Sequence, residues 1–222
     1  MSHIFVNNSP DSNGDVLEFR IRFCYSDSSV NVPVYVVLLH YPMRNRVGDT
    51  VATAVTNLDI HDISRTCRTY GIKRYFIVTP VTEQHRVVGR ILSHWKRDVS
   101  KAWHPDRFEA LARVDLAKDF ESVKAEIHSA HGEYPEVVLT DASPLPNAVT
   151  YVDYRRELES PERSKPVLIV FGTGWGISDV FYPEVHRILA PVYGLKNDPD
   201  GEYNHLSVRA AAAIILDRLF GH

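Results

Sequence analysis

A glycine-rich loop that directly follows an apolar segment is the strongest candidate for a ligand site in this sequence. The hexapeptide Phe171-Gly172-Thr173-Gly174-Trp175-Gly176 places three glycines within five residues, at the end of the apolar run 167–171. Glycine permits positive φ and lets backbone N–H groups approach a ligand closely. In an open α/β sheet, ligands bind beyond the carboxyl ends of the strands. The loop therefore predicts a ligand held largely by backbone groups, although a tight turn without a ligand has the same composition.

A dinucleotide site is the first interpretation of such a loop, and three observations oppose it. The spacing is G-x-G-x-G rather than G-x-G-x-x-G, and the loop begins at residue 172 of 222 instead of in the first strand–helix unit. Ribose recognition also calls for an acidic residue at the end of a strand about 20 residues further on, and this sequence lacks one. A nicotinamide-dependent dehydrogenase is therefore kept only as an alternative.

Two later segments could complete a site. Ala190-Pro191-Val192-Tyr193-Gly194 has the composition of a shaped turn, which could present backbone groups to a flat heterocycle or could be an ordinary surface loop. Residues 203–209 then open the last helix, where Asn204 or Ser207 can serve as the N-cap. That helix is apolar nearly all round, so it must be buried on more than one side, in a subunit interface or at the centre of a monomer.

Basic side chains gather in one part of the chain. Residues 41–101 contain eleven Lys/Arg and five Asp/Glu, a balance of +6 in a chain whose net charge is −3. Arg65 and Arg68 lie one helical turn apart, and Lys73 and Arg74 follow. Because arginine binds phosphate bidentately and stays protonated, these four side chains predict a phosphate clamp. The alternative is a stripe of charges that faces solvent.

Other kinds of site find little support in the sequence. It contains neither a G-x-S-x-G elbow nor an H-E-x-x-H pair. The two cysteines, Cys24 and Cys67, are too few for a disulfide scaffold or a thiolate zinc cluster. With no apolar run near the ~20 residues that a membrane helix needs and no signal-peptide pattern at the start, we expect a soluble, cytoplasmic protein.

The candidate residues fall between alternating strands and helices. A length of 222 residues predicts one main domain. The continuous apolar run Val34–Leu39 is typical of a buried parallel strand. Further strands are expected at 75–79, 111–117, 136–140 and 167–171, helices at 59–70, 81–98, 119–132, 151–158 and 206–220, and an edge strand at 16–23. This alternation predicts an α/β fold with a mostly parallel sheet and helices on both faces.

Taken together, these segments resemble the SPOUT superfamily of S-adenosyl-L-methionine-dependent RNA methyltransferases, from about residue 32 to the C-terminus. The first family motif resembles residues 56–68, with Arg65 at the family's arginine; the second resembles 167–176, and the third 204–210. The strings HDISRTCRTYG and YNHLSVRAA are closest to a small bacterial branch of RNA methyltransferases. Residues 1–31 lie outside the resemblance and are expected to form a partly flexible extension of a 32–222 domain.

The resemblance implies a C-terminal trefoil knot, a homodimer, an RNA substrate and no metal. It also implies a cofactor cleft made by three loops, with Arg65 approaching the methyl acceptor or its phosphate. The implied cofactor-binding residues are Thr140, Asp141, Ala142, Phe171, Gly172, Thr173, Gly174, Trp175, Gly176, Ala190, Pro191, Val192, Gly194, Asn204, His205 and Leu206. The candidate RNA-binding residues are Arg44, Arg46, Arg68, Lys73 and Arg74.

One departure from the family pattern concerns Asp59. Members that methylate the ribose 2′-oxygen carry Asn six residues before the motif-one arginine, where this chain has Asp59. We name Asp59 with Arg65 as the candidate catalytic pair, but Asp59 could equally be a helix cap or could orient Arg65. The methyl acceptor, ribose or base, in tRNA or rRNA, therefore stays open. A non-catalytic RNA- or cofactor-binding protein on the same fold is the alternative function.

Overall fold

The computed structural model describes residues 30–95, 97–194 and 203–221. A six-stranded parallel sheet has the order β5-β4-β1-β7-β6-β8. Its strands are β1 (Val34–Leu39), β4 (Tyr75–Val78), β5 (Val114–Ala117), β6 (Glu136–Leu139), β7 (Val167–Phe171) and β8 (Arg187–Ile188). A hairpin of β2 (Met43–Arg44) and β3 (Thr50–Val51) follows β1. The predicted α/β class and parallel sheet are confirmed.

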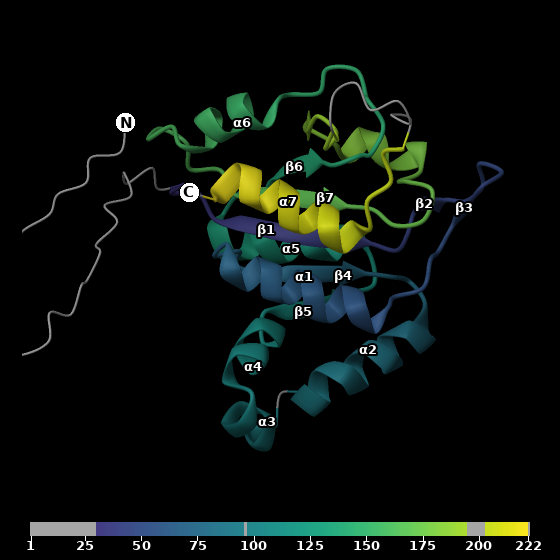
Figure 1. The fold of residues 1–222 in the computed structure, drawn as a ribbon, viewed down its shortest axis with the longest axis vertical. Helices are drawn as coiled ribbons and strands as arrows, with labels where there is room; N and C mark the ends of the chain where they lie inside the picture. Colours follow the sequence, from purple (N-terminus) through teal and green to yellow (C-terminus); the bar gives the residue numbers. More distant parts are fainter. Residues whose placement is uncertain (1–29, 96, 195–202, 222) are drawn as a thin grey trace, which may run out of the picture.

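Helices cover both faces of the sheet, as Figure 1 shows, with α1 and α7 in front of it and α5 behind. The helices are α1 (Asn57–Thr69), α2 (Thr82–Trp95), α3 (Asp98–Trp103), α4 (Pro105–Leu111), α5 (Phe120–His131), α6 (Tyr151–Leu158), α7 (Val208–Phe220) and the 3-10 helix η1 (Asp179–Glu184). None of the helices in the described ranges is long and apolar enough to cross a membrane.

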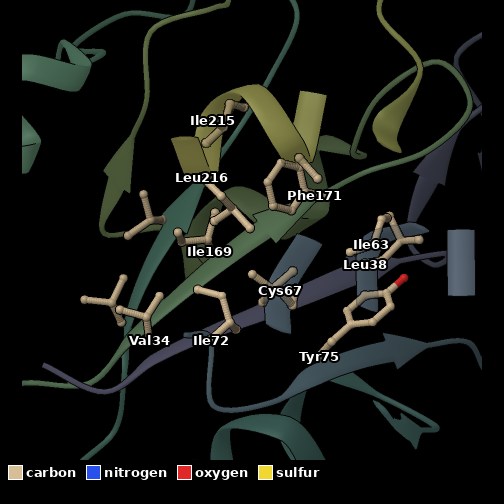
Figure 2. Close-up of a cluster of buried hydrophobic side chains, with 14 of the residues drawn as sticks. Val34, Leu38, Ile63, Cys67, Ile72, Tyr75, Ile169, Phe171, Ile215 and Leu216 are labelled. Atoms are coloured by element: carbon tan, nitrogen blue, oxygen red, sulfur yellow. The ribbon is translucent and has the colours of Figure 1, made fainter. Parts of the chain in front are cut away.

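The side chains of β1 explain why its apolar run is continuous. Val34, Val36 and Leu38 belong to one core, which they share with α1, α6 and α7. The alternate residues of the strand belong to the second core, under α5 and η1. A strand that buries both faces needs apolar residues at every position. Figure 2 shows part of the first core, where Cys67 and Leu216 meet the sheet.

Local signals placed the helices correctly, with differences at their ends. Helix α1 is capped by Thr56, whose Oγ1 accepts from Asp59 N at 3.2 Å and donates to Asp59 Oδ2 at 2.6 Å, so Asp59 is not the N-cap itself. Ser207 caps α7, as one of the two predicted candidates. Helix α5 ends at Gly132 with φ +76°, as its glycine predicted.

The largest differences lie between α2 and β5. The predicted helix 81–98 ends at Trp95, and the predicted strand 111–117 begins only at Val114. Two short helices, α3 and α4, occupy the interval, and Leu111 is buried as the last residue of α4. The apolar pattern around residue 111 marks burial of a helix end as well as a strand, because short apolar runs do not distinguish the two. The predicted strand 16–23 lies outside the described residues.

Candidate functional site

The loops that carry the candidate residues meet at one edge of the sheet. Strands β1, β7 and β6 are neighbours and parallel, so their carboxyl ends at Leu39, Phe171 and Leu139 lie side by side. The chain leaves β1 toward β4 on one side and leaves β7 toward β8 on the other. This reversal of direction is the topological switch point at which open α/β sheets bind ligands. The strand order therefore brings the loops that carry the predicted site residues to the edge of the sheet where such folds bind ligands.

The glycine-rich loop follows β7 and is fixed by tight packing. Gly174 and Gly176 have φ values of +60° and +98°, which favour glycine. A Cβ on Gly172 would lie 2.6 Å from Ile177 Cγ1, so this position has no room for a side chain. Strand β2 closes the loop from one side, because Arg44 N donates to Gly176 O at 2.9 Å. Gly174 and Trp175 remain exposed to solvent, where a ligand can reach them.

A chain of polar contacts joins the glycine-rich loop to the end of β1. His40 Nδ1 lies 3.0 Å from Thr53 Oγ1, which lies 2.6 Å from Thr173 Oγ1. Thr173 in turn donates to Leu39 O at 3.2 Å. His40 is fully buried, and burial lowers its pKa to about 4, against the opposing charge of Asp59. Within the described residues its Nε2 has no hydrogen-bond partner, so the ring is held neutral.

This burial predicts an acid-sensitive contribution of His40 to stability. The pKa of His40 is lower in the folded protein than in the unfolded chain, so the unfolded chain binds more protons between about pH 6.5 and pH 4. The contribution is fully present above pH 6.5 and is lost as the pH falls toward 4. Between pH 6.5 and pH 4, we expect the free energy of unfolding of the wild type to decrease by on the order of 3 kcal/mol more than that of His40→Asn, which has no imidazole to protonate. Urea unfolding at several pH values measures this difference. If the unfolding free energies of wild type and His40→Asn changed in parallel with pH, the acid-sensitive role of His40 would be contradicted.

The predicted cleft has three walls: residues 140–142 after β6, residues 171–176 after β7, and residues 190–194 with 204–206. The loop after β6 lies beside both of the other walls. Asn204, before α7, donates from Nδ2 to Ala142 O at 2.9 Å. Asp141 Oδ1 accepts from Ser143 N at 2.7 Å. A Cβ on Gly176 would lie 3.8 Å from Asp141 Oδ2 and 3.3 Å from Arg44 Nη2, so the glycine backbone packs closely beside a carboxylate and a guanidinium. The structure thus brings together residues that are more than 60 positions apart in the chain.

The third wall is held by contacts that the sequence did not indicate. Ala190 N donates to Val149 O at 2.9 Å, and Tyr151 OH donates to Ala190 O at 2.6 Å. Leu189 N donates to Leu139 O at 2.9 Å, which places the start of 190–194 beside the loop after β6. His205 and Leu206 are exposed, and residues 195–202 between the two halves of this wall lie outside the described part of the chain.

The two candidate catalytic residues occupy different environments on α1. Asp59 is 6% exposed, and its Oδ2 accepts from the N-cap residue Thr56, so Asp59 supports the cap of α1 without being the cap itself. Arg65 is exposed and lines a groove of about 580 Å³ between α1, α2 and α4. None of the ion pairs between described residues joins Asp59 to Arg65. The candidate pair is therefore not a contacting pair, and Arg65 is the member available to a substrate.

Two of the four residues of the predicted phosphate clamp, Arg68 and Arg74, form ion pairs with carboxylates of this chain. Arg68 Nη2 lies 2.6 Å from Glu109 Oε1 of α4, and Arg74 pairs with Asp115 of β5. Both carboxylates lie 41 positions further along the chain. Among the other candidate RNA-binding residues, Arg44 Nη1 is 3.5 Å from Asp179 Oδ1, whereas Arg46 and Lys73 are exposed. Arg65 instead shares its groove with Arg90 and Arg107, which the sequence analysis did not select.

Comparison with known proteins now decides the family. The model of a family described as SAM-dependent RNA methyltransferase matches residues 33–221. The chain belongs to this family. The match confirms S-adenosylmethionine (SAM) as the cofactor and RNA as the substrate class, and it excludes the dehydrogenase alternative. This methyltransferase also has a SPOUT-like fold, as its motifs predicted.

Two relatives illustrate the extent of the similarity. An uncharacterized protein of Aquifex aeolicus is 40% identical over 203 residues, which are 91% of this chain and 96% of the relative. A protein of Nitratidesulfovibrio vulgaris named tRNA (guanine-N(1)-)-methyltransferase is 42% identical over 188 residues, which are 85% of this chain but only 42% of the relative. The methyltransferase thus spans less than half of that relative, whose named activity belongs to the longer protein.

Solved structures support the fold at low sequence identity. TrmJ from Z. mobilis ZM4 superposes with a TM-score of 0.51 at 13% identity, covering 86% of this chain and 69% of that one. A probable methyltransferase from Bordetella pertussis Tohama I superposes with a TM-score of 0.52 at 14% identity, covering 86% of this chain and 95% of that one.

The predicted cofactor-binding residues carry groups that complement SAM. SAM carries positive charge on its sulfonium and amino groups, hydrogen-bonding groups on its adenine and ribose, and a carboxylate. The cleft offers the Asp141 carboxylate, the Asn204 side chain and exposed glycine backbone. These residues therefore fit the cofactor of the family.

Proposed function

We propose that this methyltransferase binds SAM in the cleft formed by residues 140–142, 171–176, 190–194 and 204–206. The single observation that supports this most strongly is the convergence of the three loops. Ala142 O accepts a hydrogen bond from Asn204, and the Asp141 carboxylate lies beside Gly176 of the glycine-rich loop. Bound SAM supplies an electrophilic methyl group to the RNA acceptor. The protein's own part is to hold the cofactor through backbone groups and Asp141 and to align the acceptor.

We further propose that Arg65 is the residue that engages the RNA acceptor or its phosphate. Its planar guanidinium can donate two parallel hydrogen bonds to a phosphate. Its exposed position in a groove on α1 supports this role. Asp59, the other candidate catalytic residue, is proposed instead to be a positioning residue, because its carboxylate accepts from Thr56, the N-cap of the helix that carries Arg65.

The remaining parts of the proposal concern assembly and substrate. A homodimer, a C-terminal trefoil knot and a cytoplasmic location follow the family resemblance, and the apolar α7 supports the dimer. The substrate is proposed to be tRNA or rRNA, with a ribose or base acceptor. The guanine N1 atom named for the longer relatives is one candidate.

Calorimetric titration tests the cofactor site directly. We expect SAM to bind with micromolar affinity, about −8 kcal/mol, and NAD not to bind. Binding of NAD alone, or of neither compound, would contradict the proposal. Mass spectrometry of nucleosides from RNA of cells with and without this methyltransferase would then identify the acceptor.

Asn204→Ala is expected to weaken SAM binding about tenfold. The substitution removes the hydrogen bond to Ala142 O that joins two walls of the cleft; such a bond contributes about 0.5–1.5 kcal/mol. Calorimetry measures the affinity, and the thermal unfolding midpoint of the variant shows whether the fold is intact. An affinity equal to that of wild type would place Asn204 outside the cofactor site.

A further inference from the structure

A basic groove is lined by residues of α1, α2 and α4; in Figure 1, α2 and α4 lie below α1. Its volume is about 580 Å³, large enough for one or two nucleotides. Helix α1 contributes five residues, α2 four and α4 one. The lining residues are Asn57, Leu58, His61, Asp62, Arg65, Arg90, Ile91, His94, Trp95 and Arg107.

The charge of this groove is positive and uncompensated. Among the described residues, no carboxylate oxygen lies within ion-pair distance of Arg65, Arg90 or Arg107. The one carboxylate that lines the groove, Asp62, faces Arg209 of α7, whose Nε lies 3.6 Å from Asp62 Oδ2. Three guanidinium groups that have no carboxylate partner in the described part of the chain favour a ligand that carries several negative charges.

An aromatic platform lies at the end of the groove. The guanidinium carbon of Arg107 is 4.9 Å from the centroid of the Trp95 ring, in cation–π contact. The rings of His61 and His94 meet Trp95 nearly edge-on, at 5.5 and 5.6 Å between centroids. These contacts hold the indole in place. Planes of aromatic rings and guanidinium groups are the surfaces on which unpaired RNA bases stack.

We propose that this groove binds a single-stranded segment of the substrate RNA, with phosphates at Arg65 and Arg90 and an unpaired base at the Trp95–Arg107 platform. Combining phosphate-binding arginines with a stacking surface matches RNA better than an acidic peptide, which offers charge but no bases. The inference rests on the proposed function, since it assigns the surface through which Arg65 meets its substrate.

Direct binding of an unstructured oligonucleotide tests the groove. The probe is a fluorescein-labelled U12 RNA, followed by fluorescence anisotropy at several salt concentrations. Arg90→Ala/Arg107→Ala is expected to weaken binding at least about tenfold and to lower the salt slope by roughly 0.7 for each phosphate that the variant no longer neutralises. The matched control is Arg156→Ala/Lys165→Ala, which removes the same charge from exposed positions away from the groove and should bind as wild type. Equal losses in both variants would overturn the proposal.

Trp95 provides a readout at the groove itself. In a Trp103→Phe/Trp175→Phe background it is the one remaining tryptophan of the chain, and stacking of a base should quench its fluorescence. Absence of quenching at saturating U12 would overturn the proposal. So would displacement of U12 by polyglutamate of equal charge as effectively as by unlabelled U12, because the groove would then select charge alone.

The two proposals fail in different ways. SAM affinity of Arg90→Ala/Arg107→Ala should equal that of wild type, because neither side chain belongs to the cofactor cleft. A wild-type protein that binds U12 in the groove but not SAM would contradict the cofactor site alone. A protein that binds SAM but binds U12 independently of the groove would contradict this inference alone.

Discussion

Replacing Arg65 by alanine is expected to lower methyl transfer by about 10²–10³-fold, the usual effect of removing one positioned charge at a reacting centre, while leaving SAM affinity unchanged. Arg65 is exposed, and its removal leaves no buried partner without a hydrogen bond. The fold should therefore persist, and the loss should fall on the chemical step. Transfer of a labelled methyl group from SAM to total RNA of cells that lack this methyltransferase measures the effect.

Two further variants make the Arg65 result specific. Arg156→Ala removes an exposed arginine of α6 and should keep full activity. Arg65→Lys keeps the charge but loses the planar, bidentate guanidinium, so partial activity would show how much of the effect is charge alone. Loss of SAM affinity in Arg65→Ala would instead place this side chain in the cofactor site, and full activity would remove it from catalysis.

Gly174→Val is expected to weaken SAM binding by about 10–100-fold. Gly174 has φ +60°, a conformation in which a β-branched residue is strained by roughly 1–3 kcal/mol. Its Cβ would also lie 3.2 Å from Thr53 Cγ2, within the polar chain that fixes the loop. The loop must therefore move or take a side chain into the cleft. Calorimetry with SAM gives the affinity.

The chain offers a close control for this strain. Gly132 has φ +76° at the end of α5, and a Cβ there meets no atom within 4 Å. Gly132→Val should cost a similar amount of folding stability and leave SAM affinity intact. If both variants lose affinity equally, the effect is one of stability; if Gly174→Val binds SAM normally, the cofactor lies elsewhere.

Local patterns in the sequence were sufficient to predict five of the six strands of the parallel sheet and the five longest helices. The apolar run Val34–Leu39 forms the central strand because both of its faces are buried. The helix predicted at 59–70 forms as α1, and the glycine-rich loop lies at the carboxyl end of β7. These features depend on side-chain spacing within a few residues, which is visible in the sequence.

Features that depend on contacts between distant segments could not be predicted in this way. Arg68 and Arg74 looked equivalent to Arg65, yet Glu109 and Asp115 neutralise them. Arg90, Trp95 and Arg107 gave no signal as a group, because they lie on two helices with different directions and α4 was not expected. The link from His40 to the glycine-rich loop depends on the contacts His40–Thr53 and Thr53–Thr173, which no local pattern in the sequence indicates.

The sequence by itself determined the fold class, the order of the five predicted strands and five predicted helices, and the family with its cofactor and RNA substrate. It did so because burial periodicity, caps and glycine loops are local, and because the motifs occur in the family's order. The tertiary structure alone decided which charges remain free, since an ion pair forms only where packing places a carboxylate beside a guanidinium. It therefore decided that the basic surface is the groove of α1, α2 and α4.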